Sequence, residues 1–182
     1  MVSTEDLATT EAILDAEGEA ASRTFAQEPG EGEALWWLGM SATIKVTKEQ
    51  TGGRYALVEV LAPDGYEAVL HVHHQEDEGF YILEGEMTFY VGDQKIKAQP
   101  GSYLFGPKDV PHAFTVDSGP ARLLFVFSPG GLEGLVREMG EPAGSLAVLL
   151  QPEGPPDEAE MERMAAIAAR YGAEILGPPP EQ

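Results

Sequence analysis

The four histidines of this chain lie in two short stretches framed by glycine, and their spacing suggests metal chemistry. The stretches read Gly65-x5-His71-x-His73-x4-Glu78-x6-Gly85 and Gly101-x5-Pro107-x4-His112. Imidazole nitrogens and carboxylate oxygens bind divalent transition metals, and three histidines with one glutamate leave coordination positions open for a substrate. The sequence therefore predicts a metal site whose protein ligands are His71, His73, Glu78 and His112.

Strand geometry explains how these ligands could meet. Residues two apart on a strand point to the same side of a sheet, so His71 and His73 would project together. Glu78 follows a short polar turn, and a hairpin there would bring its carboxylate across from the two imidazoles. His112 comes from a separate strand, which requires the sheet to close on itself. The elements that position the ligands must therefore be strands of a closed sheet.

Three other polar side chains lie close to the ligands in the sequence. Glu76 and Asp77 are the competing carboxylates of the turn, and we expect both to be solvated. His74 does not share the strand face of His71 and His73, so we do not expect it to bind the metal. We expect it either beside the ligands or exposed to solvent.

Composition limits the class of partner. The 182 residues suit one domain with appended segments, and 31 acidic residues against 11 basic ones give a formal net charge of -20. This charge disfavours nucleic acid and anionic membranes, which leaves a small molecule as the expected partner. With no cysteine, disulfides and thiolate chemistry are excluded. No signal-like N-terminus or membrane-length apolar run is found, so a cytoplasmic location is expected.

Changes in residue composition and hydrophobic pattern divide the chain into three parts. Residues 1–33 form an acidic N-terminal extension with a short helix near Ser3 and a linker over 27–33. Residues 34–130 contain short β-branched runs between Gly, Pro and Asp, which predict an antiparallel sandwich or barrel. The expected strands are 42–47, 54–61, 67–73, 80–83, 86–91, 95–98, 103–105, 112–116 and 122–127. Gly92-Asp93 suits a tight hairpin between two of them.

Residues 131–182 form a C-terminal helical extension. We expect a helix over 132–139, ended by Gly140, and a second one that begins at the N-cap Asp157 and ends at Gly172. The second helix places Met161, Met164, Ala168 and Tyr171 on one face, which predicts that it covers the exterior of the barrel.

The first glycine-framed stretch resembles the first motif of the cupin superfamily at every defining position. In the second motif, Gly101, Pro107 and His112 fit, whereas Asp109 stands where glycine is usual and Val116 where asparagine is usual. The resemblance covers roughly residues 35–130. It implies an all-β fold, a single cupin barrel of the double-stranded β-helix or jelly-roll type, here with short C-terminal helices.

The segment Ser128–Glu133 is similar to that of small single-domain cupins related to quercetin 2,3-dioxygenases. The resemblance implies a metal-dependent oxygenase that acts with O2 on an enolic or hydroxylated aromatic molecule, with Glu78 as both ligand and base. One divalent metal is expected, and the ligand set does not distinguish Fe, Mn, Ni, Co, Cu and Zn. Phe80, Ile82 and Phe114 share the ligand-bearing faces, so they either line a substrate pocket or fill the barrel.

Other functions remain open because the same ligands serve several chemistries. A metal-dependent isomerase or epimerase acting on a sugar phosphate would need basic residues near the metal, for which Arg54 and Arg122 are the candidates. A non-enzymatic metal-binding or ligand-binding cupin would seal the metal from solvent. The apolar strand near 35–40, with Trp36 and Trp37, suits core packing or the edge of a homodimer, which is our expectation.

Overall fold

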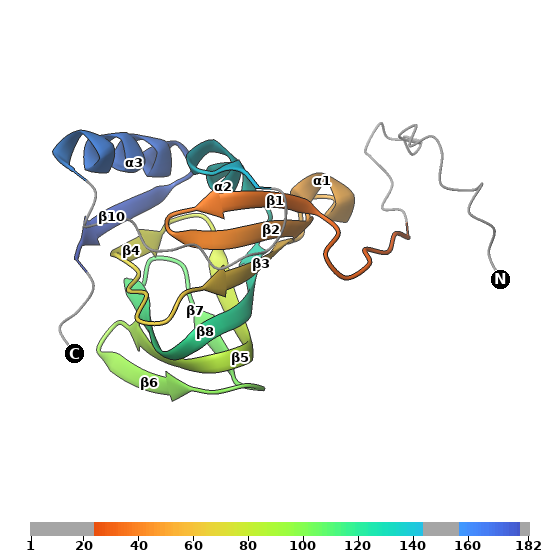
Figure 1. The fold of residues 1–182 in the computed structure, drawn as a ribbon. Coiled ribbons are helices and arrows are strands. Elements are labelled where there is room, and N and C mark those ends of the chain that lie inside the picture. Colours follow the sequence, from red (N-terminus) through yellow and green to blue (C-terminus); the bar gives the residue numbers. More distant parts are fainter. Residues whose placement is uncertain (1–23, 144–156, 179–182) are drawn as a thin grey trace.

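The computed structural model describes residues 24–143 and 157–178 (Figure 1). The helix expected near Ser3 lies outside these ranges. In chain order the elements are β1 (Glu33–Trp37), β2 (Met40–Val46), α1 (Lys48–Thr51), β3 (Ala56–Ala62), β4 (Leu70–His73), β5 (Asp77–Val91), β6 (Gln94–Ala98), β7 (Tyr103–Gly106), β8 (His112–Ser128), α2 (Glu133–Met139), β9 (Glu141–Pro142), α3 (Glu158–Arg170) and β10 (Ala173–Gly177). The all-β class with short C-terminal helices is confirmed.

The strands form one antiparallel sheet in the order β10-β4-β8-β3-β2-β1-β9, and β5 pairs with β6, β7 and β8. The hairpin at Gly92-Asp93 is confirmed, because Val91 pairs with Gln94 and Gly92 has a φ of 58°. The ribbon of β5 and β8 is the longest pairing and runs from Asp77 opposite Ser128 to Val91 opposite His112. It wraps through the middle of the molecule in Figure 1 and carries two of the predicted metal ligands.

Each strand of this ribbon was predicted as two separate strands, and that prediction was wrong. Gly85 does not end a strand but lies inside β5, with a φ of 84°, where the pairing with β8 shifts register. A Cβ at this position would lie 2.8 Å from the Cα of Ala121, so only glycine lets the two strands approach. The ribbon bends here, and its two ends turn toward each other.

The core of the barrel is aromatic. The second half of β8 alternates buried with partly buried side chains, as expected for a strand with one inward face. Strand β5 instead has two continuous buried runs, over residues 78–80 and 87–90. The Phe80 ring lies 4.9 Å from that of Phe89 and 5.2 Å from that of Phe125, in tilted and edge-on contacts. Phe114 and Phe127 extend this cluster through Phe125. Such contacts add about 0.5–1.5 kcal/mol per pair beyond the apolar area they bury.

The C-terminal segment has the two predicted helices and also two strands that were not predicted. Helix α3 begins as expected, with the Asp157 carboxylate accepting a hydrogen bond of 2.8 Å from the Glu160 N–H. Its buried face includes Met164, Ile167 and Ala168. Strand β10 then pairs with β4, and β9 pairs with β1. In Figure 1, α2, α3 and β10 lie together at one end of the barrel, so this segment is an integral part of the sheet.

The edge on which the dimer expectation rests is partly used within the chain. Leu35 and Trp37 of β1 are buried in the core of this subunit. Strand β9 pairs with the same strand at Leu35 and Trp36. A homodimer stays a prediction, and it would need a surface other than these paired backbone groups.

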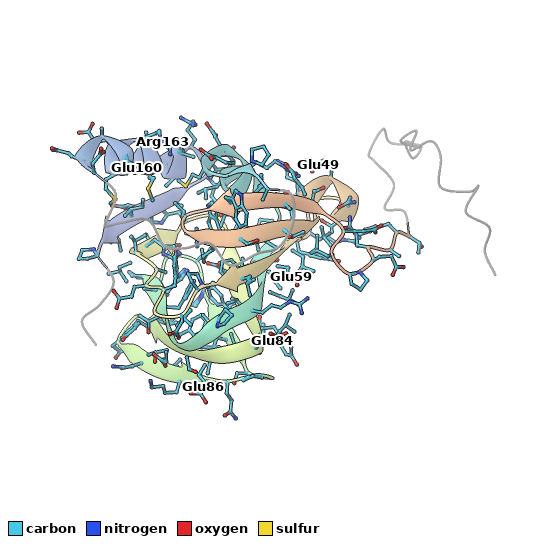
Figure 2. The ribbon with its side chains drawn as sticks, viewed as in Figure 1. Glu49, Glu59, Glu84, Glu86, Glu160 and Arg163 are labelled. Carbon is cyan, nitrogen blue, oxygen red and sulfur yellow. The ribbon has the colours of Figure 1, made fainter. Side chains whose placement is uncertain are left out.

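Acidic side chains are spread over the outside of the molecule. Figure 2 shows Glu84, Glu86 and Glu160 at its periphery, and all three are exposed. Glu59 is buried but pairs with the guanidinium of Arg122. Within the described ranges, no helix has the length and apolar composition that a bilayer crossing requires.

Candidate metal centre

The four predicted ligands come together inside the barrel. One ligand atom from each of His71, His73, Glu78 and His112 lies within 4.8 Å of all the others. The Glu78 carboxylate oxygen Oε2 is 3.1 Å from Nε2 of His73 and 3.0 Å from Nε2 of His112. His73, Glu78 and His112 are almost fully buried, whereas His71 is partly exposed. The side chains thus converge from β4, β5 and β8.

The hairpin expected between β4 and β5 is not how Glu78 reaches the histidines, because these two strands do not pair with each other in the described sheet. Strand β8 connects them. His71 of β4 pairs with His112 of β8, and β8 pairs with β5 along its whole length. Glu78 and His112 lie near opposite ends of that ribbon, and its bend at Gly85 brings them into contact.

Backbone carbonyl groups orient two of the three imidazoles. Nδ1 of His71 donates a hydrogen bond of 2.8 Å to the carbonyl oxygen of Val69, and Nδ1 of His112 donates one of 2.9 Å to Val110. In each ring this leaves Nε2 directed toward the cluster. Holding Nδ1 in this way fixes which nitrogen can bind a metal.

The charges in the cluster favour a cation. Burial, followed by the neighbouring His112 and His73, lowers the pKa of His71 to about 4, so this imidazole is neutral near pH 7. Burial acts to raise the pKa of Glu78, but the hydrogen bonds from His112 and His73 outweigh it and hold that pKa well below its usual range. Burial likewise acts to lower the pKa of His112, but the contact with Glu78 reverses this and raises the pKa overall.

This donor set fits a divalent transition metal. A charged carboxylate withdrawn from water is costly unless a positive group accompanies it, and in the described site that charge is supplied only by protons on imidazoles. A metal ion could take the place of those protons, and the four side chains would then be its nitrogen and oxygen ligands. Imidazole and carboxylate together suit Fe, Mn, Co, Ni, Cu and Zn, and the ligands do not select among them.

An apolar cavity reaches the cluster. Together with its opening to solvent it contains about 710 Å³ of empty space, of which only about 80 Å³ is enclosed cavity. His71, His73 and Glu78 form its polar end. The wall is aliphatic and aromatic, and no lysine or arginine is among the described residues that line it. Arg122 pairs with Glu59 and Glu84, and Arg54 donates to the carbonyl oxygen of Thr51.

Of the three residues expected to line a pocket, Phe80 and Phe114 line this cavity. Ile82 is fully buried in the core and is not among the lining residues. The C-terminal segment forms much of the wall, which its sequence pattern did not predict, through Leu135, Val136, Met139, Met164, Ala168, Ala173, Glu174 and Ile175. The apolar face of the helix from Asp157 was the available signal, but it was read as a cover for the barrel exterior.

Tyr66 and Trp37 also line the cavity and were not predicted to do so. The Tyr66 ring lies 5.8 Å from that of Phe114, and burial raises the pKa of its hydroxyl. No hydrogen bond joins this hydroxyl to another described residue. It is therefore a polar group of the cavity that a ligand could use.

The remaining polar residues near the ligands differ in their exposure and in their hydrogen-bond partners. His74 is about half exposed and its Nδ1 lies 2.7 Å from Oδ1 of Asp109, so it does not join the cluster. Asp109 has a φ of 62°, which explains why glycine is usual at this point of the motif. Asp77 accepts a hydrogen bond from the Lys108 N–H. Glu76 was expected to be solvated, and that expectation was wrong, because only 5 % of its surface is exposed.

An antiparallel barrel with a histidine and glutamate cluster inside it defines a class of small β-barrel proteins that can hold a metal ion. Residues 57–127 match the family described as Cupin domain. Quercetin 2,3-dioxygenase from Bacillus subtilis (strain 168) is 32% identical over 118 residues, which cover 65% of this chain and 35% of that protein. An uncharacterized protein of Methanocaldococcus jannaschii is 28% identical over 74 residues, which cover 40% of this chain and 59% of that protein.

The fold is shared with solved cupins. An RmlC-like cupin from Shewanella frigidimarina superposes with a TM-score of 0.51 at 20% identity, over 62% of this chain and 96% of that one. These matches support a cupin domain over residues 57–127 of this chain. It spans about a third of the length of the dioxygenase that it matches, so that enzyme's activity is not carried over with the fold.

Proposed function

We propose that this protein is a metal-dependent oxygenase that acts with O2 on an enolic or hydroxylated aromatic molecule. The observation that carries the proposal is the position of the metal-ligand cluster at the polar end of an otherwise apolar cavity. Such a cavity suits a flat uncharged ring system with one oxygen that reaches the ligands. The 32% identity to a quercetin 2,3-dioxygenase supports the same reaction class.

His71, His73 and His112 would hold the metal, with Glu78 as the fourth ligand. When bound, the metal supplies Lewis acidity that lowers the pKa of the substrate hydroxyl beside it. The apolar wall excludes water from the reacting oxygen, which strengthens every charge interaction at this end of the cavity.

Glu78 would accept the proton that the substrate hydroxyl loses. In the metal-free protein its pKa is held low by contacts with Nε2 of His73 and of His112. Those nitrogens are the same atoms that would bind the metal, so they lose the protons that they donate to the carboxylate. Glu78 then no longer accepts these hydrogen bonds, and its second carboxylate oxygen could accept the proton of a hydroxyl bound beside it.

The isomerase alternative is less well supported for phosphorylated sugars. Such substrates carry two negative charges that need basic partners. Both candidate arginines are engaged elsewhere, and the described cavity lining contains acidic Glu78 and Glu174 but no basic side chain other than histidine. A neutral substrate without phosphate remains compatible with the cavity.

The test uses the full chain without a histidine tag, stripped of metal and reloaded separately with Fe²⁺, Mn²⁺, Co²⁺ and Ni²⁺. Oxygen uptake is followed with 3-hydroxyflavone, and with flavone, which lacks the enolic hydroxyl. We expect uptake with the first compound only. Absence of uptake with every metal would reject the oxygenase, and retained metal and 3-hydroxyflavone binding would then support a non-enzymatic binding protein.

Two substitutions sharpen this test. His112→Ala removes a buried ligand and is expected to abolish both metal binding and uptake. His74→Ala is the matched control, because it also removes a histidine, but one that is exposed and outside the cluster. Equal metal content in the two variants would contradict the ligand assignment.

A further inference from the structure

The three imidazoles of the cluster are not held alike. His71 and His112 each donate from Nδ1 to a backbone carbonyl, as described above. Nδ1 of His73 is buried and has no hydrogen-bond partner among the described residues. Nothing in its immediate backbone therefore fixes its ring or selects the tautomer that presents Nε2 to a metal. An unpaired buried donor of this kind costs about 1–3 kcal/mol.

A complementary unpaired acceptor belongs to Glu76. This residue lies in the turn between β4 and β5, three positions after His73, and its carboxylate oxygen Oε2 is buried without a partner. Burial raises the pKa of this carboxyl overall, and the neighbouring His73 acts against that rise. The described part of the chain thus contains a buried imidazole nitrogen and a buried carboxylate oxygen that both lack a partner, three residues apart. When Nε2 of His73 binds a metal, Nδ1 must carry the ring proton and needs an acceptor.

The other carboxylates near Glu76 are already engaged. The Glu133 carboxylate accepts hydrogen bonds of 2.8 Å from the backbone N–H groups of Lys48 and Gly131. Asp77 accepts one of 2.9 Å from the Lys108 N–H. Glu78 contacts His73 through Nε2, on the metal side of the ring. Among these carboxylates, Glu76 is the one with a buried oxygen that has no partner in the described ranges.

We propose that Glu76 is a positioning residue, whose Oε2 accepts a hydrogen bond from Nδ1–H of His73, either directly after a small rotation or through one bridging water. It gives His73 the support that a backbone carbonyl gives His71 and His112, and it holds Nε2 as the ligand atom. Carboxylate partners of this kind strengthen metal binding by 10–100-fold in metal sites generally. The inference rests on the metal-binding part of the proposed function and does not require oxygen chemistry.

The test compares full-length Glu76→Ala, Glu76→Gln and Asp77→Asn. Asp77→Asn is the matched control, because it removes the same charge one residue away while its amide oxygen can still accept from Lys108. Zn²⁺ affinity is measured by competition with a chromophoric chelator. We expect Glu76→Ala to weaken binding by about 10–100-fold, Glu76→Gln by less because its amide oxygen still accepts, and Asp77→Asn by under about threefold.

A second readout uses the Zn²⁺-loaded protein, in which Nε2 of His73 binds the metal and the ring proton is on Nδ1. Solvent exchange of this proton is followed by ¹H–¹⁵N NMR of the imidazoles. We expect slow exchange in the wild type and in Glu76→Gln, and faster exchange in Glu76→Ala. The proposal is overturned if exchange is as slow in Glu76→Ala as in the wild type, or if that variant binds Zn²⁺ as well as Asp77→Asn. Absence of oxygen uptake would refute the oxygenase alone, because neither readout depends on it.

Discussion

Gly85 allows the β5–β8 ribbon to bend, and replacing it with alanine should be costly for two separable reasons. Its φ of 84° lies in the left-handed region, where a side chain costs about 1–2 kcal/mol. A new Cβ would also lie 2.8 Å from the Cα of Ala121 and 3.0 Å from the carbonyl oxygen of Ser118. Backbone atoms of a paired strand cannot move freely, so overpacking adds about 1–3 kcal/mol. We expect Gly85→Ala to lower the free energy of unfolding by about 2–5 kcal/mol.

Gly101→Ala is the matched control for this experiment. Gly101 has a similar φ of 90°, but a Cβ there meets nothing within 4 Å, so only the conformational cost of about 1–2 kcal/mol applies. Both variants and the wild type are unfolded in urea and the free energies are extrapolated to water. The reasoning is refuted if Gly85→Ala is no less stable than Gly101→Ala. If Gly85→Ala folds, its Zn²⁺ affinity should also fall, because the bend brings Glu78 to His112.

Three further outcomes follow from single contacts. Glu133→Ala leaves two partly buried backbone N–H groups without their charged acceptor and should cost about 2–5 kcal/mol in urea unfolding, with Glu133→Gln intermediate. Tyr66→Phe removes a hydroxyl with no described protein partner, so the unfolding free energy should change by under about 0.5 kcal/mol, and a larger loss would reveal a structural bond. The pKa of His74 is raised by its hydrogen bond to Asp109, and by Glu174, so its stabilisation is full below the unfolded value of about 6.5 and is lost as pH rises through the folded value. His74→Gln should therefore lower the Tm at about pH 5.5 and leave it unchanged at about pH 9.

Most of the ligand cluster could be predicted from the sequence because His71, His73 and Glu78 lie close together in the chain. The alternation of His71 and His73 follows from strand geometry alone, and the spacing to Glu78 fits one turn. The route by which His112 joins them could not be predicted, since it depends on a bend inside a long ribbon. A glycine inside a strand and a glycine that ends one look the same in a sequence, and only the pairing partner of Gly85 distinguishes them.

Burial of Glu76 was missed for a different reason. An acidic residue in a polar turn is normally solvated, and nothing within the turn indicates otherwise. A Cβ at Gly131, which lies 55 positions further along the chain, would be 3.6 Å from the Glu76 carboxylate, so this distant segment packs over the turn. Strand β10 was missed because five residues carry too short a pattern, and its pairing with β4 is long-range.

The metal ligands and most of the cavity wall come from different parts of the chain, which makes metal binding and ligand selectivity separable. The ligands lie on β4, β5 and β8, whereas α2, α3 and β10 contribute much of the wall. Met164 of α3 lines the cavity but is not a ligand. We expect Met164→Ala to leave the Zn²⁺ affinity within about threefold of wild type, since the ligands and their orienting bonds are untouched. It should enlarge the cavity and change the affinity for 3-hydroxyflavone, measured by fluorescence titration of the Zn²⁺-loaded protein. A loss of Zn²⁺ affinity as large as that of Glu76→Ala would mean that the C-terminal segment holds the metal site together, and the two parts would then not be independent.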